Sequence, residues 1–267
     1  MSPNAEEQSV TDGSDLEWLG LERVGPGHWS FVLAPSLSRL DWKFYGGTGV
    51  AVATAVMEAE TGRRALWTTA QFVSSAPTGT RMDCRVEIVA GGRRTSQVRV
   101  TGWDGERLVF SGQGATGEPR PGPLEAQFPQ MPDVPPPADC PRWVPRPFVT
   151  GPDERPGWLS ITDARLADER GSMWMRLEGR PLSRAGMAFV ADIVPNGVLR
   201  AAGRSGAGTS LDNTLRFGPE PEGEWVLVHV EPHLISGGYV HGGAGLWSSA
   251  GTFLGVASQT AGIVLFD

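Results

Sequence analysis

Three residues in the C-terminal part of the sequence carry side chains that can bind a metal ion or move protons. His229, Glu231 and His233 occupy every second position, which places them on one face of a β-strand. Together with His241 they could offer nitrogen and oxygen ligands of the kind that zinc takes. Pro232 interrupts the set and no further ligand has a defined position, so a half-exposed polar strand face explains the pattern better. We therefore expect no metal and no prosthetic group.

A second feature that could do chemistry is a stretch of backbone. Tyr45, Gly46 and Gly47 lead into a segment of small and apolar residues with helical length, Gly47–Ala59. The N–H groups at a helix N-terminus can bind an oxyanion without rearrangement. Paired glycines leave no Cβ in the way of an approaching carbonyl group. This helix start is therefore a predicted binding element.

The elements that must position these residues occur as two groups of four strands, each preceded by one helix. The first helix is Gly47–Ala59, and the second is predicted over Arg184–Val194, where Pro195 would stop it. The predicted strands alternate or run apolar between Gly-rich turns: Leu66–Ser74, Arg81–Val89, Arg94–Trp103, Arg107–Gly114, Thr209–Phe217, Trp225–Glu231, Tyr239–Trp247 and Thr252–Val264. A helix that is apolar nearly all round must be enclosed, here by the curved sheet that follows it.

The two groups match each other along the sequence at a nearly constant offset. The pairs at offsets of 144 to 146 are Trp29 and Trp174, Leu66 and Leu211, Thr69 and Thr214, Phe72 and Phe217, Trp103 and Trp247, Gly105 and Gly251, Leu108 and Leu254, and Gln113 and Gln259. A constant offset over several strands indicates a tandem duplication of a unit of about 110 residues.

The duplication gives two polar residues a context. Asp212 falls at the position of Trp67 in the first copy, so a charged side chain replaces an aromatic one. This difference indicates that the two copies have divided their roles. Gln259 falls at the position of Gln113, so a glutamine there could be structural in both copies.

A proline-rich segment separates the copies. Thirteen of the 22 prolines lie between Pro119 and Pro156. Because proline supplies no ladder donor and breaks helix interiors, this segment must be an extended connection. Its scattered apolar residues predict that it lies against a surface. We predict a disordered tail over 1–15, an N-terminal domain over 16–117, a linker over 118–157 and a C-terminal domain over 158–267.

Composition narrows the range of partners and compartments. The net charge of −7 and the pI near 5.2 disfavour nucleic acid as a partner. No stretch approaches roughly 18 uninterrupted apolar residues, so no membrane span is expected. Cys84 and Cys140 are the only cysteines and lie in unlike contexts, and the polar start Met1–Asp15 lacks the features of a signal peptide. A reduced, cytoplasmic protein is the expectation.

Several motifs carry a resemblance to a known family. In the first copy they are Trp42–Gly47 and Gly92–Thr95, and in the second they are Ser210–Phe217, Glu224–Leu227, Gly238–Gly242 and Ala257–Gln259. These motifs resemble those of the type II acyl-CoA thioesterase family and cover most of the chain outside the tail and the linker. The resemblance implies an α+β fold of the tandem, or double, hotdog type, in which each half is a helix wrapped by a curved antiparallel sheet.

The resemblance also implies a set of catalytic residues. That family hydrolyses acyl-CoA thioesters without a covalent intermediate, using an Asp, a Thr or Ser, and a Gln around one attacking water. By this resemblance the Asp is Asp212 and the Gln is Gln259, which suits a carboxylate that accepts a proton and an amide that holds a water. The hydroxyl should fall between Glu231 and Gly238, where this sequence has no Thr. His233 and Ser236 are the two candidates to replace it, and spacing does not choose between them.

The substrate side follows from the same resemblance. Acyl-CoA is the expected partner, with its acyl chain along the first helix and its reacting carbonyl group at Tyr45, Gly46 and Gly47. Arg93 and Arg94 could meet the phosphates of CoA.

Two other functions stay open. A hotdog hydratase or dehydratase acting on acyl thioesters would pair an acid with a histidine, and Asp212 with His233 or His241 could serve. The missing Thr would equally permit a catalytically silent protein that only binds acyl thioesters.

Two expectations concern assembly. Each half alone would expose a sheet face, so we expect the halves to pack as a pseudo-dimer with their helices side by side. We also expect the whole chain to form a homo-oligomer.

Overall fold

The computed structural model describes residues 14–120, 122, 124–149 and 154–266. Almost all of the predicted tail, 1–15, lies outside the described residues. The helices are α1 (Ser14–Trp18), α2 (Gly46–Thr61), α3 (Arg184–Val190) and α4 (Val194–Ala201), with short 3-10 turns at Pro35–Leu37, Pro137–Asp139 and Gly157–Ser160. Within these described residues, no helix is both long and apolar enough to cross a membrane.

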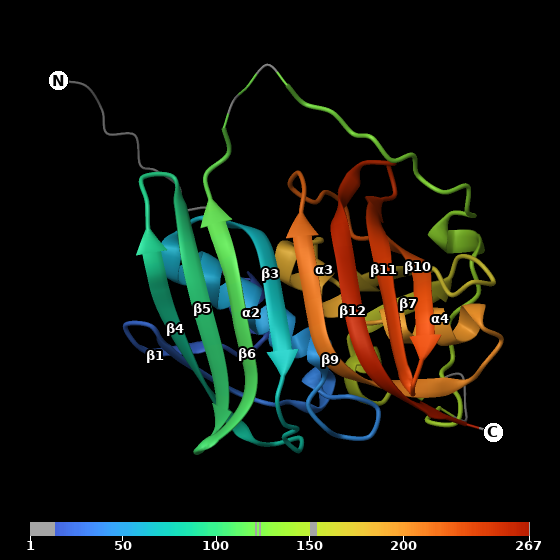
Figure 1. Cartoon of the computed structure of the whole chain (residues 1–267), viewed down its shortest axis with the longest axis horizontal. Coiled ribbons are helices and arrows are strands. Elements are labelled where there is room, and N and C mark those ends of the chain that lie inside the picture. Colours follow the sequence, from blue (N-terminus) through green and yellow to red (C-terminus); the bar gives the residue numbers. More distant parts are fainter. Residues whose placement is uncertain (1–13, 121, 123, 150–153, 267) are drawn as a thin grey trace.

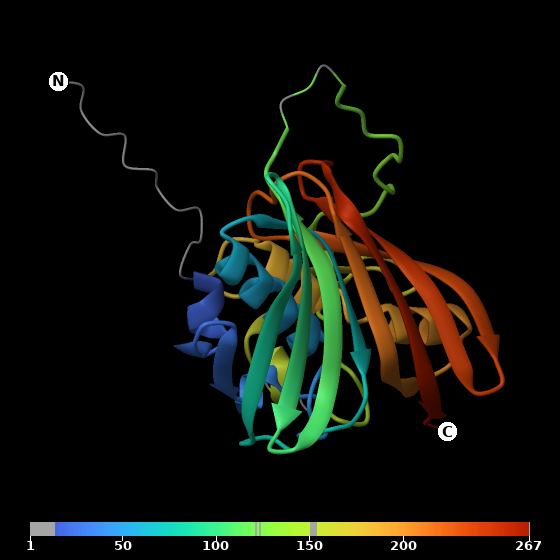
Figure 2. The same ribbon diagram turned by 60° about the vertical axis from the view of Figure 1, so that its left-hand side comes forward.

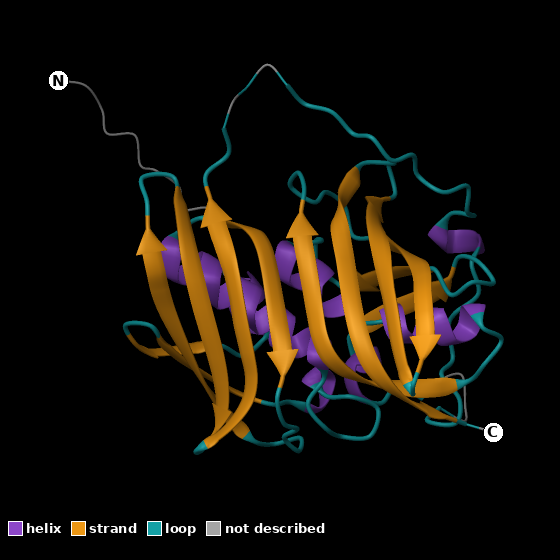
Figure 3. Ribbon diagram, in the orientation of Figure 1, coloured by secondary structure: helices purple, strands orange, loops and turns teal. Residues whose placement is uncertain are grey.

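The described residues form twelve strands in one continuous antiparallel sheet, in the order β1-β2-β4-β5-β6-β3-β9-β12-β11-β10-β8-β7. Their bounds are β1 Glu22–Gly25, β2 His28–Val32, β3 Arg64–Phe72, β4 Arg81–Gly91, β5 Thr95–Asp104, β6 Arg107–Gly117, β7 Thr162–Leu166, β8 Met173–Leu177, β9 Gly206–Phe217, β10 Val226–Ser236, β11 Tyr239–Ser248 and β12 Phe253–Leu265. The strand order of the second half is the order of the first half reversed. The helices lie on one side of this sheet (Figures 1 and 3).

The two halves join at the central strands β3 and β9. Thr69 and Thr214, which the duplication aligns with each other, are direct partners across this junction, and their hydroxyl oxygens are 2.5 Å apart. Equivalent residues can face each other in this way only where a twofold-like axis passes between them. The helices α2 and α3 also pack against each other. The predicted tandem arrangement of two helices wrapped by antiparallel sheet is therefore confirmed.

The helices of the two halves differ. In the first half, α2 is one continuous helix of 16 residues, apolar nearly all round and ended by Gly62 in the left-handed region at φ 63°. In the second half the helix stops after Val190, turns, and restarts as α4 at Val194. The prediction that Pro195 stops the second helix is wrong, because this proline lies in the first turn of α4. The N–H groups of a first turn make no hydrogen bond within the helix, so proline is tolerated there.

Four short strands were not predicted. Strands β1, β2, β7 and β8 contain only four or five residues each, too few for a clear alternation to stand out from the neighbouring turns. The aligned residues Trp29 and Trp174 lie on β2 and β8, so the duplication includes these outer strands.

The linker arches from the end of β6 to the second half (Figure 1), and Figure 2 shows the same connection from the side. It lies against the second half, as predicted from its apolar residues. The Trp174 indole donates a hydrogen bond to the Pro135 carbonyl at 2.8 Å, and the rings of Trp143 and Trp158 stack with centroids 5.9 Å apart.

Candidate active site

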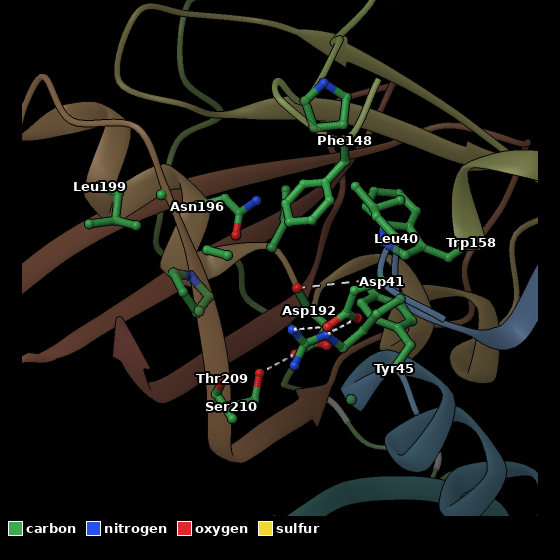
Figure 4. A pocket seen from close by; sticks show the side chains of 18 of the residues that line it. Leu40, Asp41, Tyr45, Phe148, Trp158, Asp192, Asn196, Leu199, Thr209 and Ser210 are labelled. Atoms are coloured by element: carbon green, nitrogen blue, oxygen red, sulfur yellow. Dashed lines mark hydrogen bonds and ion pairs between the residues drawn. The ribbon is translucent and has the colours of Figure 1, made fainter. Parts of the chain in front are cut away.

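A cavity of about 520 Å³ lies between the start of α2, the α3–α4 connection, the start of β9 and the linker. Figure 4 shows Tyr45, Asp192, Ser210 and Phe148 around the same space. Tyr45 comes from the first half, Asp192 and Ser210 come from the second, and Phe148 comes from the linker. Because all three parts of the chain line the cavity, neither half could form it alone.

Asp192 is the buried acid of this cavity. It lies in the break between α3 and α4 and is only 8% exposed. Its Oδ2 accepts a hydrogen bond from the Gly47 N–H at 2.7 Å, and its Oδ1 accepts from Gln259 Nε2, from Asn213 Nδ2 at 3.2 Å and from Ser210 Oγ at 3.4 Å. Burial raises the pKa of Asp192 to about 6, although these hydrogen bonds act to lower it. The carboxyl group can therefore exchange a proton close to neutral pH.

The start of α2 approaches Asp192 closely because glycines form it. A Cβ on Gly46 would lie 2.7 Å from Asp192 Oδ2, and a Cβ on Gly47 would lie 2.3 Å from the Phe189 carbonyl oxygen. The N-cap residue Tyr45 provides no side-chain cap. Its hydroxyl instead donates to the Phe189 carbonyl at 3.1 Å, and burial raises the Tyr45 pKa, so the hydroxyl keeps its proton. At the start of α2 the Gly47 N–H therefore donates to the acid, and Gly46 lies in the cavity wall.

Gln259 and Asn213 support Asp192 from behind. They face each other on β12 and β9 and are 3% and 0% exposed. Gln259 Nε2 also donates to Ser210 Oγ at 2.7 Å, and Ser210 in turn lines the cavity. Gln259 Oε1 and Asn213 Oδ1 have no hydrogen-bond partner among the described residues. These two amide oxygens can therefore accept a hydrogen bond from water while the amide nitrogens keep their contacts with Asp192.

Asp212 lies outside this group. It follows Ser210 on β9, where a bulge against β12 leaves Leu211 unpaired. The bulge brings Ser210 and Asn213 to the same side of the sheet, and Asp212 lies between them on the other side. Its Oδ1 accepts a hydrogen bond from the Thr260 N–H at 2.9 Å. Asp212 therefore satisfies backbone at the bulge and does not line the cavity.

The structure also keeps the two candidate replacements for the family hydroxyl apart from Asp192. His233 and Ser236 are exposed on the far part of β10. Ser236 pairs with Tyr239 at the end of the β10–β11 hairpin. A bulge near His233 interrupts the alternation on which the metal pattern depended, and among the described residues no three His, Cys, Asp or Glu side chains are grouped as a metal site.

Of the five predicted substrate-binding residues, two line the cavity, one lies directly behind its wall and two lie far from it. Tyr45 and Gly46 are in its wall, and Gly47 contacts Asp192 behind it. Arg93 and Arg94 lie in the β4–β5 turn, where the Arg93 carbonyl accepts a hydrogen bond from Arg63, just beyond the C-terminus of α2. A helix of this length spans about 24 Å, so the arginine pair is at the opposite end of α2 from the cavity.

The structural equivalent of Gln259 in the first half is Gly114, because Gly114 faces Thr68 as Gln259 faces Asn213. Gln113 faces Thr69 and is exposed. The prediction that Gln113 and Gln259 are equivalent is therefore wrong by one residue, and a shift of one residue along a strand exchanges the two faces of the sheet.

Sequence reasoning missed Asp192, Asn213 and Ser210 as site residues. Only Asp192 had a local signal. It is a lone acid in the apolar run Ala185–Val194. An acid that is buried with such apolar neighbours needs hydrogen-bond donors or a positive charge beside it. Asn213 and Ser210 carry no such signal, because strand register alone decides which face they take.

Comparisons with known proteins agree with this architecture. The sequence model of the acyl-CoA thioesterase N-terminal domain matches residues 33–117, and the model of the acyl-CoA thioesterase C-terminal domain matches residues 126–263. None of the curated proteins gives a significant match.

Solved structures match over almost the whole chain. A provisionally named thioesterase from Novosphingobium aromaticivorans has 29% identity and a TM-score of 0.80, over 91% of this chain and 98% of that chain. The tesB protein of Mycobacterium avium subs paratuberculosis has 19% identity and a TM-score of 0.78, over 96% of this chain and 100% of the other. The acyl-CoA thioesterase II TesB2 of Mycobacterium marinum has 18% identity and a TM-score of 0.72, over 95% and 99%. At such identities the two mycobacterial structures show a shared fold.

Proposed function

The chain belongs to the acyl-CoA thioesterase family, and from this premise we propose that it hydrolyses acyl-CoA with Asp192 as the base that activates water. The observation that carries the proposal is the buried Asp192 carboxyl group in the cavity wall, with its pKa raised to about 6 beside the start of α2. A base with a pKa just below the working pH is ionised and still able to accept a proton.

The proposed first step joins water to the thioester. Asp192 accepts a proton from a water molecule while the water oxygen bonds to the thioester carbonyl carbon. Ser210 Oγ, which lies in the cavity wall, is placed to hold this water beside the carboxylate. The carbonyl oxygen becomes an oxyanion, and the Gly46 N–H in the cavity wall, at the positive end of the α2 dipole, is the proposed donor to it.

The proposed second step releases the products. The tetrahedral intermediate collapses, the carbon–sulfur bond breaks, and the CoA sulfur takes the proton that Asp192 holds. The products are the free acid and CoA thiol, and no acyl group is bound to the protein at any stage. Gln259 and Asn213 are positioning residues in this scheme, because both donate to Asp192 Oδ1 and lie behind the cavity wall.

The two alternatives make different use of the site. A hydratase of the kind considered above needs a histidine beside the acid, yet none of the four histidines, all of which the structure describes, lines the cavity. A silent binding protein needs no base, and nothing in simple binding would call for an acid that four hydrogen bonds orient.

One assay separates the three functions. The protein is incubated with acyl-CoAs of several chain lengths, and free thiol, product mass and protein mass are recorded. Hydrolysis releases thiol, incorporates oxygen from ¹⁸O-labelled water into the acid, and leaves the protein mass unchanged. Intact thioester with the added mass of water indicates hydration, thermal stabilisation alone indicates binding, and an acylated protein contradicts the proposed mechanism. A cytoplasmic location and self-association stay predictions, the latter to be tested by light scattering.

A further inference from the structure

The charge of the cavity is opposite to that of the chain. The chain has a net charge of −7, but four arginines and only two acids line the cavity: Arg39, Arg146, Arg200, Arg204, Asp41 and Asp192. An anionic ligand is repelled by an acidic protein as a whole, so a site that takes one needs a local excess of positive charge. The cavity wall provides this excess.

The pairing of these groups shows which arginines have free charge. Arg39 Nε lies 3.0 Å from Asp41 Oδ1, and Lys43 Nζ lies 3.7 Å from Asp41 Oδ2, so the charge of Asp41 is already balanced. Arg146 and Arg200 are both exposed, and among the described residues neither has an ion-pair partner. Two guanidinium groups therefore border the cavity without an anion in the part of the chain that the structure describes.

The α4 helix connects the reaction centre to one of these arginines. Ile193, Asn196, Leu199 and Arg200 line the cavity in succession after Asp192, and Figure 4 shows Asn196 and Leu199 along this side. From Val194 to Arg200 the helix rises about 9 Å. This side of the cavity therefore starts at the Asp192 carboxyl group, continues with the Asn196 amide and the apolar Leu199 side chain, and ends at the Arg200 guanidinium group.

We propose that Arg146 and Arg200 bind the phosphate groups of CoA, with the pantetheine arm lying along α4 between them and Asp192. The proposal rests on the function proposed above and adds the place of the nucleotide end of the substrate. The pantetheine arm carries amide groups and apolar methylene groups, which match Asn196 and Leu199. Guanidinium groups bind phosphate oxygens through paired hydrogen bonds. Arg93 and Arg94, the arginines predicted from the sequence, are excluded by their distance from the cavity.

The test compares two substrates that differ only in phosphate. Arg146→Ala, Arg200→Ala and the double variant are assayed with an acyl-CoA and with the same acyl group on pantetheine, which has no phosphate. Each single substitution is expected to raise the KM for acyl-CoA about threefold to tenfold, with kcat within twofold. The KM for acyl-pantetheine should not change. The Arg93→Ala/Arg94→Ala double variant is the matched control and should leave both substrates unaffected.

Salt provides a second measurement. In the wild-type protein the KM for acyl-CoA should rise with ionic strength, and the double variant should have lost most of this dependence. An equal rise in KM for both substrates would mean that the arginines only shape the cavity and would overturn the proposal. Unchanged KM for acyl-CoA would overturn it as well.

The test also distinguishes failure of the proposed function. If the wild-type protein released no thiol from either substrate, the affinity for acyl-CoA would be measured by titration instead. Weaker acyl-CoA binding by the Arg146→Ala/Arg200→Ala variant would then support the phosphate site without hydrolysis, and equal affinity would reject the site.

Discussion

The place that Asp192 occupies in the second half has a counterpart in the first half that is built from neutral groups. In the first half, Thr54 stands in the place of Asp192 and Thr68 in the place of Asn213. Thr54 Oγ1 donates a hydrogen bond to Thr68 Oγ1 at 3.1 Å. Gly114 stands at the position of Gln259, and a Cβ on Gly114 would lie 2.9 Å from the Met57 sulfur. The first half thus has a threonine hydroxyl in place of the acid, and a methionine fills the space that the Gln259 side chain takes in the second half.

The starts of the helices differ in the complementary way. In α3 the Ser183 hydroxyl accepts a hydrogen bond from the Gly186 N–H, and Arg184 pairs with Glu220 next to it. In α2 the N-cap Tyr45 offers no side-chain cap, and the Gly47 N–H donates to Asp192 instead, next to Gly46 in the cavity wall. One half therefore supplies the acid and the other supplies the backbone donors, and a single site results from two copies of the same unit.

The largest effect on activity is expected at Asp192, where the second half has an acid and the first half has a neutral side chain. Asp192→Asn preserves size and removes the proposed base, so kcat should fall about 10²- to 10⁴-fold, or about 3–5.5 kcal/mol of barrier. Asp212→Asn is the matched control and should keep kcat within about threefold, since Asp212 accepts a hydrogen bond from the Thr260 N–H and lies outside the cavity wall. Thiol release is measured for both, with thermal unfolding to confirm that they fold. A larger loss of kcat in Asp212→Asn than in Asp192→Asn would identify Asp212 as the base.

The next test compares the two glutamines. Gln259→Ala removes a donor to the Asp192 carboxylate, and hydrogen bonds to charged groups are worth about 1.5–3 kcal/mol, so kcat/KM should fall about 10- to 100-fold. The pH at which activity is half-lost should move upward, because the removed hydrogen bond lowers the Asp192 pKa. Gln113→Ala should change neither quantity. A loss with no movement of the pH profile would point to a structural role for Gln259.

A third test adds one methyl group at the second residue of a helix. In Gly47→Ala the new Cβ would lie 2.3 Å from the Phe189 carbonyl oxygen, so we expect a loss of about 1–3 kcal/mol in the free energy of unfolding together with lower kcat. Ala185 occupies the second position of α3, and Ala185→Gly should cost no more than about 1 kcal/mol. Urea denaturation measures both. Equal stability of Gly47→Ala and wild type would mean that α2 and α3 can separate freely.

A fourth test uses pH, because each half has a buried acid with a raised pKa, Glu58 in the first and Asp192 in the second. Burial raises the pKa of Asp192 to about 6 and that of Glu58 to about 7. The base works only when ionised, so kcat/KM should fall about tenfold per pH unit below pH 6. Glu58→Gln should leave this acid limb in place, since Glu58 accepts from the Ala65 N–H and lies outside the cavity wall.

Stability should change with pH in the opposite direction from activity. The folded protein keeps the Asp192 proton up to about pH 6, whereas the unfolded chain releases it near its ordinary value of 3.8. Between these values the unfolding free energy should decrease as pH rises, by up to about 3 kcal/mol for this group. Asp192→Asn should lose this contribution, and denaturation at pH 4 and pH 7 measures it. A wild-type stability that rises through this window by the same amount as the variant's would contradict the raised pKa.

The smallest effect on stability is expected at the β3–β9 junction between the halves. Thr69→Val and Thr214→Val each break the hydroxyl pair at the β3–β9 junction, and each should lower the unfolding free energy by about 1 kcal/mol. The double variant should lose less than the sum of the two, because both substitutions remove the same hydrogen bond. If the two losses in unfolding free energy simply added, the hydrogen bond between the two hydroxyl groups would contribute nothing to the stability of the junction.

Much of the fold could be predicted from local patterns, and these patterns also show why the site could not. The alternation of the long strands, the apolar helix after Gly46 and the constant offset between copies are all properties of short or repeated segments. The register at a bulge is not such a property. Leu211 is the extra residue, and its presence determines that Ser210 and Asn213 face the helices and that Asp212 does not.

By itself, the sequence determined a duplicated unit, a glycine-based helix start and a family. Only the tertiary structure decided which acid enters the cavity. Asp192 meets Gly47 across 145 residues and Gln259 across 67, contacts that follow from the packing of α2 against α3 and of the broken helix against β9 and β12. The physical reason is that strand side chains alternate with a period of two, so a one-residue bulge reverses which polar groups are buried. A buried acid is tolerated only where several donors from distant segments converge on it.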